Sequence, residues 1–191
     1  MNIGLLFYRY RSYTPLPLLA VGVILGHPTI DSIGGGLFLC IIGEAIRFWG
    51  VHTAGPLTRM TAGPGGNDLV THGPYAFIRN PLYLGNIIIY TGIGLMTNIW
   101  WMPVFGWMYF KIQYDFIISE EERYLIGHFG ERYATYMKHV RRFFPRFTAY
   151  RDGLSEQFKV STAETLHSER RTFQAIAIAL IIMTALAYLK N

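Results

Sequence analysis

Five apolar runs constrain what this sequence of 191 residues can fold into. A helix that crosses the hydrocarbon core of a bilayer, which is roughly 30 Å thick, needs about 20 residues. The runs cover residues 16–26, 33–51, 82–96, 99–118 and 172–189. The first run is the shortest, and a membrane-spanning helix there would also have to include residues 8–15. We therefore predict an all-α integral membrane protein, a single membrane domain with about five transmembrane helices.

The composition supports a membrane protein over a soluble domain or a nucleic-acid-binding one. Hydrophobic residues make up 51% of the chain and charged residues only 15%, which is unlike an ordinary soluble domain. The net charge of +5 comes mainly from Lys and Arg residues in the polar segments between the apolar runs, where juxtamembrane cations are expected. The single cysteine, Cys40, can form no internal disulfide. We therefore expect no nucleic-acid partner and assign no redox compartment.

The distribution of cations predicts the orientation of the helices. With five spans, one side of the membrane holds the N-terminus and residues 52–81 and 119–171, which contain most of the Lys and Arg residues. The only Lys or Arg residue on the opposite side is Lys190. By the positive-inside rule, the N-terminus and the polar segments are cytoplasmic and the C-terminus lies on the other side.

Two charged residues interrupt the second apolar run. Glu44 and Arg47 are three residues apart, so they lie on one face of a helix and could form an ion pair. Ionisable groups inside a membrane are costly and usually face the protein interior or a water-filled pocket. The pair is either part of a pocket wall or a structural ion pair near the cytoplasmic end.

The segment that follows the fourth run is charged but keeps a helical pattern of apolar residues. We predict two helices within residues 119–147, with a break near Phe129 and Gly130. The second would carry its aromatic residues on one side, which suits a helix at the level of the lipid headgroups. Pro145 would end it, because the residue before a proline avoids the helical conformation.

A polar loop dense in His, Tyr, Arg and Asn, residues 70–85 (VTHGPYAFIRNPLYLG), is where we expect chemistry. The third and fourth spans are separated only by Thr97 and Asn98, so they form a tight hairpin. This hairpin brings the loop close to three consecutive glutamates, Glu120–Glu122. At least one of these glutamates is expected to be a solvated residue at the surface of a helix.

The residues of this region suit a zwitterionic ligand that also carries a cation. Arg79 could hold a carboxylate in a bidentate contact. A glutamate could accept a hydrogen bond from an ammonium group, and Tyr75 or Tyr83 could contact a sulfonium through its ring face. No metal site is expected, because the sequence has neither an H-E-x-x-H motif nor a cysteine pair.

Two motifs in this region resemble a known family. The first is T-H-G-P-Y-x-x-x-R-N-P-x-Y-x-G at residues 71–85, and the second is E-E-x-x-L-x-x-x-F-G-x-x-Y-x-x-Y at residues 121–136. Together they resemble the isoprenylcysteine carboxyl methyltransferase and phospholipid methyltransferase superfamily of integral membrane enzymes. The resemblance covers residues 69–145, and many members have R-H-P where this chain has R-N-P. The last apolar run, residues 172–189, lies beyond the family core.

The resemblance implies a methyltransferase that uses S-adenosyl-L-methionine, bound in a pocket that the C-terminal cytoplasmic segment covers. The acceptor would be a prenylcysteine carboxylate, a phospholipid amine or a lipophilic thiol or amine. An amine would have to lose a proton, for which Glu121 or Glu122 is the candidate acceptor. The implied catalytic residues are Glu121, Glu122 and Arg79. The implied cofactor-binding residues are His72, Gly73, Pro74, Tyr75, Arg79, Asn80, Pro81, Tyr83 and Glu121.

Two alternatives to a methyltransferase stay open at this point. Sterol reductases have a similar C-terminal arrangement with NADPH, although they have a longer helical scaffold than this chain could form. The chain could also be a non-enzymatic membrane protein whose last span mediates assembly. The expected partners are a lipophilic or lipidated substrate and membrane lipid, and the sequence does not indicate the methyl acceptor or the oligomeric state.

Overall fold

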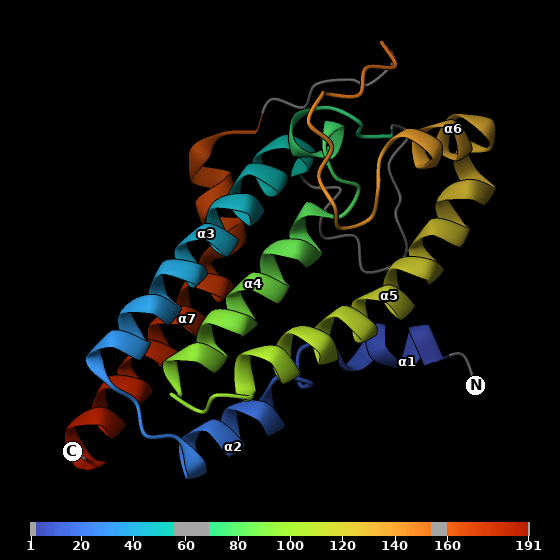
Figure 1. Cartoon of the computed structure of the whole chain (residues 1–191). Helices are drawn as coiled ribbons and strands as arrows, with labels where there is room; N and C mark the ends of the chain where they lie inside the picture. The colour runs from blue at the N-terminus through green and yellow to red at the C-terminus, as the bar shows by residue number, and fades with distance from the viewer. Residues whose placement is uncertain (1–2, 56–68, 154–159, 191) are drawn as a thin grey trace.

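The computed structural model describes residues 3–55, 69–153 and 160–190 (Figure 1). Within these residues the fold contains α-helices and a short 3-10 helix and no strand, which confirms the predicted all-α class. The α-helices are α1 (Ile3–Tyr10), α2 (Leu16–Leu25), α3 (Ile30–Ala54), α4 (Pro81–Met96), α5 (Met102–Phe129), α6 (Glu131–His139) and α7 (Thr162–Lys190), and the 3-10 helix is η2 (Gly73–Ala76).

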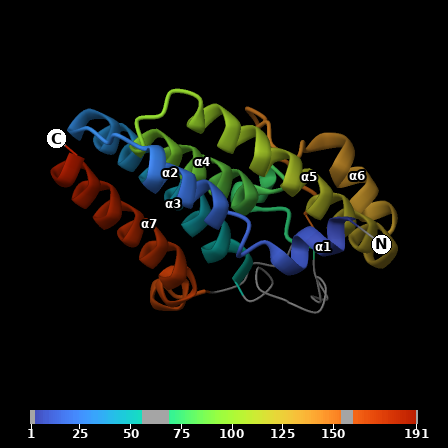
Figure 2. The ribbon, with the colours of Figure 1, turned by 90° about the horizontal axis from the view of Figure 1, so that it is seen from below.

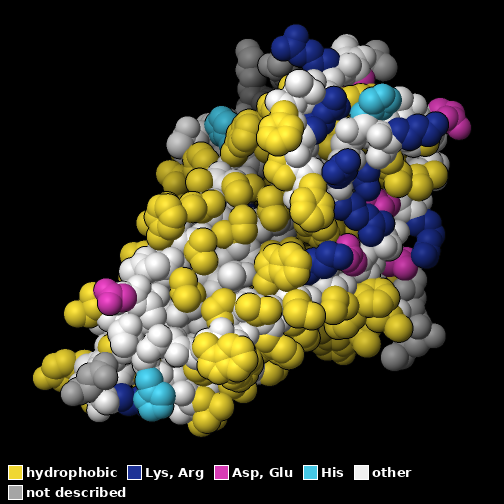
Figure 3. Space-filling view, in the orientation of Figure 1, with side chains coloured by type: hydrophobic (Ala, Val, Ile, Leu, Met, Phe, Trp, Pro, Cys, Tyr) yellow, Lys and Arg dark blue, Asp and Glu magenta, His cyan; other side chains and the backbone are white. Residues whose placement is uncertain are grey.

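Two of these helices, α3 and α7, are long and apolar enough to cross a membrane. Helix α7 packs beside α3, and α4 also packs against α3 (Figures 1 and 2). Large apolar side chains point outward from several helices; Phe38 of α3 and Ile181 of α7, for example, are 64% and 67% exposed. Figure 3 shows hydrophobic side chains over much of the visible face, with Lys and Arg gathered toward the end that holds α6. This division between an apolar body and a charged end is typical of a membrane protein.

The first predicted span differs from the structure. Residues 8–15 do not extend α2, because α1 ends at Tyr10 and residues 11–15 form turns. Pro15 explains the break, since its ring removes a backbone donor and disfavours the helical conformation of Thr14. The ten residues of α2 reach only about 15 Å. The count of five spans therefore stays a prediction.

The hairpin and the break in the charged segment are both confirmed. The chain turns from α4 into α5 at Thr97 and Asn98, where Asn98 has a φ of 56°. Helix α5 continues well beyond the predicted apolar span and ends at Phe129, before Gly130 with a φ of 53°. Helix α6 ends at His139, earlier than Pro145 alone predicts, and Val140 after it has extended backbone angles.

Glycines let the backbones of α3 and α4 touch. A Cβ atom on Gly43 would lie 2.6 Å from the carbonyl oxygen of Gly85, and one on Gly85 would lie 2.6 Å from that of Gly43. Gly36 and Gly92 make the same reciprocal contact one heptad away, at 2.4 and 2.6 Å. Small residues at such positions allow close helix packing in membranes. These contacts hold α4 against α3. Because α4 begins within the last residues of the polar loop, they also position that end of the loop.

We expect Gly43→Ala to destabilise the protein by about 1–3 kcal/mol, because the added methyl group overlaps the backbone of α4. The control is Gly34→Ala on the same helix, where a Cβ meets nothing within 4 Å. Alanine is the better helix former there and is expected to be neutral or stabilising. Thermal unfolding in mild detergent measures both. Equal unfolding temperatures for the two variants would contradict the close contact.

Helix α7 is fastened to the rest of the fold near both of its ends. Near its start, the buried Glu169 accepts hydrogen bonds from the Nε and Nη2 atoms of Arg47 at 3.0 and 2.6 Å. At its end, Lys190 donates to the carbonyl oxygens of Gly26 and Ile24 at 2.8 and 3.2 Å, close to the end of α2. These polar contacts fix α7 lengthwise along α3.

Candidate active site

The polar loop and the segment after α6 lie against each other at one end of the helices (Figure 1). The backbone amide of Arg79 donates to the carbonyl of Arg141 at 2.9 Å. Two more hydrogen bonds have their donors in the segment after α6. The amide of Arg146 donates to the carbonyl of Phe77, and the amide of Tyr150 donates to the carbonyl of Ala76. The chain after α6 therefore covers the loop that contains the first motif.

The shape of the loop depends on Gly73 and on two prolines. Gly73 has a φ of 58°, and a Cβ there would lie 2.6 Å from the Oγ1 atom of Thr53 on α3. Pro74 is buried within η2, and Pro81 is the first residue of α4, a position where its missing amide hydrogen costs nothing. These residues direct the loop from the end of α3 to the start of α4.

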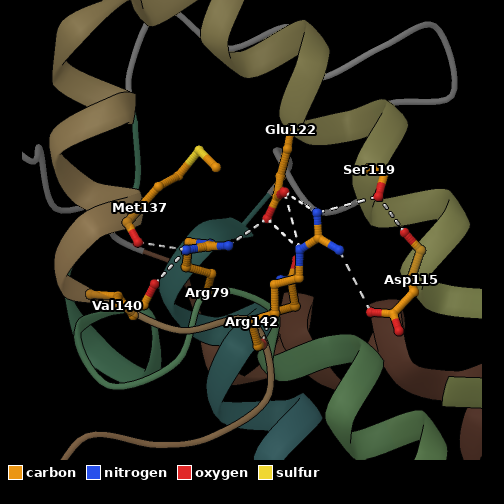
Figure 4. Close-up of polar contacts among 8 residues, drawn as sticks. Arg79, Asp115, Ser119, Glu122, Met137, Val140 and Arg142 are labelled. Atoms are coloured by element: carbon orange, nitrogen blue, oxygen red, sulfur yellow. Dashed lines mark hydrogen bonds and ion pairs between the residues drawn. The ribbon is translucent and has the colours of Figure 1, made fainter.

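A buried ion cluster joins the two motifs (Figure 4). Glu122 on α5 is only 4% exposed, and its carboxylate faces two arginines. Arg79 of the loop approaches it at 2.8 Å, and Arg142 donates through Nε at 3.1 Å to both of its oxygens. Arg142 also lies 3.6 Å from Asp115, which is about two turns nearer the middle of α5. The predicted proximity of the loop to the glutamates is therefore present in the structure.

The remaining contacts of Arg79 are also internal. Its Nη1 atom donates to the carbonyl oxygens of Met137 and Val140, which a helix end would otherwise leave without partners (Figure 4). Of its three side-chain nitrogens, only Nε is buried without a hydrogen-bond partner. Arg79 thus links the end of α6 to the loop. Its guanidinium contacts Glu122 and two backbone carbonyls of the protein, whereas the sequence predicted that it would hold a ligand carboxylate.

Glu121 points to a different neighbour from Glu122. Its carboxylate accepts a hydrogen bond of 2.6 Å from the hydroxyl of Tyr83 at the start of α4. Burial raises the pKa of Glu121 above its ordinary value of 4.5, while the bond from Tyr83 and the charge of Arg11 oppose the increase. Glu120, in contrast, pairs with the exposed Arg123. The side chain of Glu120 is itself 21% exposed, so the expectation of a solvated glutamate is met only in part.

The other loop residues differ in what they contact. Tyr75 is half-buried, and burial raises the pKa of its phenol, with the charge of Arg47 opposing and that of Glu121 adding to the shift. Burial lowers the pKa of His72, and the charge of Asp152 opposes that decrease. Asn80 makes only a long contact, 3.5 Å, with the carbonyl of Arg142.

Two contributors to the site did not emerge from the sequence. Arg142 was only one of many cations in the charged segment, yet it is the second arginine that pairs with Glu122. Tyr136 donates through its hydroxyl to the carbonyl of Tyr75 at 2.6 Å. The spacing of Tyr133 and Tyr136 within the second motif was the available signal, because it orients this face of α6 toward the loop.

The donor set fits a methyl donor that carries a cation. Glu121 offers a partly buried carboxylate, to which the hydroxyl of Tyr83 donates. The unpartnered Nε of Arg79 is a further donor. Within the described ranges, no three His, Cys, Asp or Glu residues lie close enough together to hold a metal ion.

Fold and site together define a helical membrane protein with a buried polar site at one end of its apolar helices. The sequence model of the phospholipid methyltransferase family matches residues 31–132. This match covers more than half of the chain, including the first motif and most of the second with its glutamate pair, so the chain belongs to the phospholipid methyltransferase family. Helix α7 lies outside the matched residues.

Individual relatives agree with this assignment. The protein-S-isoprenylcysteine O-methyltransferases of Tribolium castaneum and Rattus norvegicus are each 34% identical over 125 residues, which cover 61% and 62% of this chain and 42% and 43% of theirs. A cobalt-zinc-cadmium resistance protein, CzcN, of Cupriavidus metallidurans is 38% identical over 85 residues, 44% of this chain and 39% of its own. The chain thus spans about two fifths of the length of these curated relatives.

Proposed function

We propose that this chain transfers a methyl group from S-adenosyl-L-methionine to a lipid-like or membrane-embedded acceptor. The observation that supports this most is the pair of contacts between the two motifs, Arg79 with Glu122 and Tyr83 with Glu121. They join the motifs at the charged end of an apolar bundle, where an amphipathic acceptor and a water-soluble methyl donor can meet. The names of the isoprenylcysteine methyltransferases support a lipidated acceptor.

In this proposal the cofactor supplies a methyl group on a positively charged sulfur, which is already activated for transfer. The protein then has to align the donor and the acceptor and exclude water, a contribution of about 7–11 kcal/mol in favourable cases. The partly buried carboxylate of Glu121 favours the bound cation, and Tyr75 and Tyr83 enclose it. Arg79 and Glu122 act as positioning residues, because their mutual contact holds the loop beneath the end of α6.

An amine acceptor would also need a base, whereas a carboxylate or a thiolate would not. We assign this role to Glu121 over Glu122, since Glu122 is already neutralised by two arginines. The site lies on the side of the membrane that carries most of the Lys and Arg residues, which by the positive-inside rule is the cytoplasm. The C-terminal end of α7 then lies on the other side.

The role of Glu121 as a base predicts a pH dependence. A protonated carboxyl cannot accept a proton, so kcat/KM for an amine acceptor falls as the pH decreases through the pKa of Glu121. Burial raises this pKa, so the acid limb is expected above pH 4.5. Tyr83→Phe removes the bond that lowers the pKa, so the limb should move to higher pH. Tyr124→Phe, at an exposed position of α5, is the control. A limb that stays in place or moves to lower pH in Tyr83→Phe would refute the base assignment.

The proposal is tested by calorimetric binding of S-adenosyl-L-methionine, S-adenosylhomocysteine and NADPH to the purified protein in mild detergent. Binding of both adenosyl ligands and not of NADPH is the expected result. Glu121→Gln should weaken the affinity for S-adenosyl-L-methionine by about tenfold or more, the effect of one lost contact with a charged group. Glu120→Gln, which changes the neighbour that pairs with the exposed Arg123, should leave the affinity unchanged. If folded protein binds NADPH alone, the reductase alternative replaces the methyltransferase.

A further inference from the structure

The chain that follows α6 exposes two phenylalanines. Residues 143–147 read F-F-P-R-F, and we call them the aromatic segment. Phe143 packs against the buried core around Tyr114 and Ile118. Phe144, in contrast, is 70% exposed, and Phe147 is fully exposed. Two phenyl rings in this state are costly in water and favourable in lipid.

The aromatic segment lies beside the ends of apolar helices. Figure 1 shows the chain descending after α6 to the start of α4 and then rising again. Pro145 lines a groove of about 290 Å³ together with Ile46 and Trp49 of α3 and Leu84 of α4. Ile46 precedes Ala54, the last residue of α3, by about 12 Å along the helix. Trp49 is 48% exposed, and tryptophan is enriched where membrane helices meet the lipid headgroups.

The same stretch of chain carries cations and no carboxylates. Residues 138–151 contain no Asp or Glu, and their Lys and Arg residues are Lys138, Arg141, Arg142, Arg146 and Arg151. Arg142 is engaged by Glu122. Lys138, Arg141 and Arg151 are exposed and form no ion pair with any described residue. Exposed aromatic rings among unpaired cations are typical of a surface that binds anionic lipid.

This surface is attached to the loop of the candidate active site. The amide of Arg79 donates at 2.9 Å to the carbonyl of Arg141, just before the aromatic segment. The amide of Arg146, within the segment, donates at 3.0 Å to the carbonyl of Phe77. An interaction that holds the aromatic segment at the membrane therefore also holds it over the loop.

We propose that Phe144 and Phe147 insert into the adjoining lipid leaflet and that the exposed cations bind anionic phospholipid headgroups there. Anionic lipid then keeps the chain after α6 closed over the candidate active site. Lipid suits this surface better than an acidic protein does, because the rings lie beside the same helix ends as Trp49. The effect on the cofactor rests on the proposed function, whereas the contact with lipid does not.

Spin labelling of the full chain in lipid nanodiscs tests the contact with lipid. A nitroxide on Phe147→Cys should collide more often with dissolved oxygen than with a water-soluble nickel chelate, as should one on Phe38→Cys of α3. Gly127→Cys should show the reverse, because it is exposed near the end of α5 and a Cβ there meets nothing within 4 Å. Cys40 is fully buried, so it does not take up the label.

Calorimetric binding of S-adenosylhomocysteine tests the effect on the site. This ligand has no net charge, so a charged membrane surface does not concentrate it as it would the cationic methyl donor. Its affinity should be about fivefold higher or more in nanodiscs of phosphatidylcholine with phosphatidylglycerol than in phosphatidylcholine alone, the contribution of roughly one cation near an anionic surface.

Two matched variants test which cations are responsible. Arg141→Gln should remove most of the gain from phosphatidylglycerol, and it keeps the backbone carbonyl that accepts from Arg79. Arg123→Gln should keep the gain, because this exposed arginine is already paired with Glu120.

Each part of the proposal has an outcome that overturns it. A label at residue 147 that is as accessible to the nickel chelate as one at residue 127 would refute the contact with lipid and point to an acidic soluble partner. Equal affinities with and without phosphatidylglycerol would refute the control by anionic lipid. If no adenosyl ligand binds in either lipid, the proposed function fails, and the label at residue 147 still decides whether the aromatic segment lies in the membrane.

Discussion

Replacing Glu122 with alanine is expected to destabilise the protein by about 3–5 kcal/mol, the usual cost of removing one partner of a buried ion pair. The reason is that Arg79, whose side chain is 8% exposed, would keep its charge and lose its counter-charge. Arg142 would lose the same partner. Equilibrium unfolding in mild detergent, followed by circular dichroism, measures the loss.

The adjacent glutamate provides the control for this prediction. Glu120 pairs with Arg123, whose side chain is 70% exposed, and surface pairs of this kind contribute roughly 0–1 kcal/mol. Glu120→Ala should therefore unfold almost as the unaltered protein does. If Glu122→Ala were as stable as Glu120→Ala, the buried cluster would not hold the loop and α6 together.

Replacing Arg47 with methionine should be as damaging, by about 3–5 kcal/mol, and more damaging than Glu169→Gln. Methionine keeps the length and apolar packing of the side chain but leaves Glu44 and Glu169 buried without a cation. In Glu169→Gln the arginine remains, and Glu44 at 3.7 Å can become its partner. A larger loss of stability in Arg47→Met than in Glu169→Gln would therefore show that Arg47 neutralises both carboxylates.

The control for Arg47 is another charged residue on an apolar helix. Lys111 of α5 pairs with Asp115, but both side chains are partly exposed, at 41% and 30%. Lys111→Met should cost little, because the aspartate is left in contact with solvent or headgroups. If Arg47→Met were as stable to unfolding as Lys111→Met, Arg47 would not be what holds α7 against α3.

Local features of the fold were predictable from the sequence, because they depend on neighbours in the chain. The apolar runs that became α3 and α7, the turn at Thr97 and Asn98, and the break at Gly130 each follow from helix length or backbone freedom. The predicted extension of the first span through residues 8–15 was wrong for a local reason too, since Pro15 separates these residues from the apolar helix that follows.

Contacts between distant residues could not be predicted in the same way. Helical spacing identified the pair Glu44 and Arg47, but the stronger partner of Arg47 is Glu169, 122 residues further along the chain. The placement of Arg79 was missed for a related reason. A motif arginine is expected to bind a ligand, and only the path of the chain after α6 shows that carbonyl oxygens at Met137 and Val140 reach it first.

The glycine contacts between α3 and α4 also determine which parts of the protein can move. Two close backbone contacts, at Gly36 with Gly92 and at Gly43 with Gly85, leave no room for an additional side chain at either point. Sliding or rotation of one helix against the other would cause overlap at both contacts, so α3 and α4 are expected to move as one rigid body. Any opening that admits a substrate from the bilayer then has to come from displacement of the elements packed around this pair.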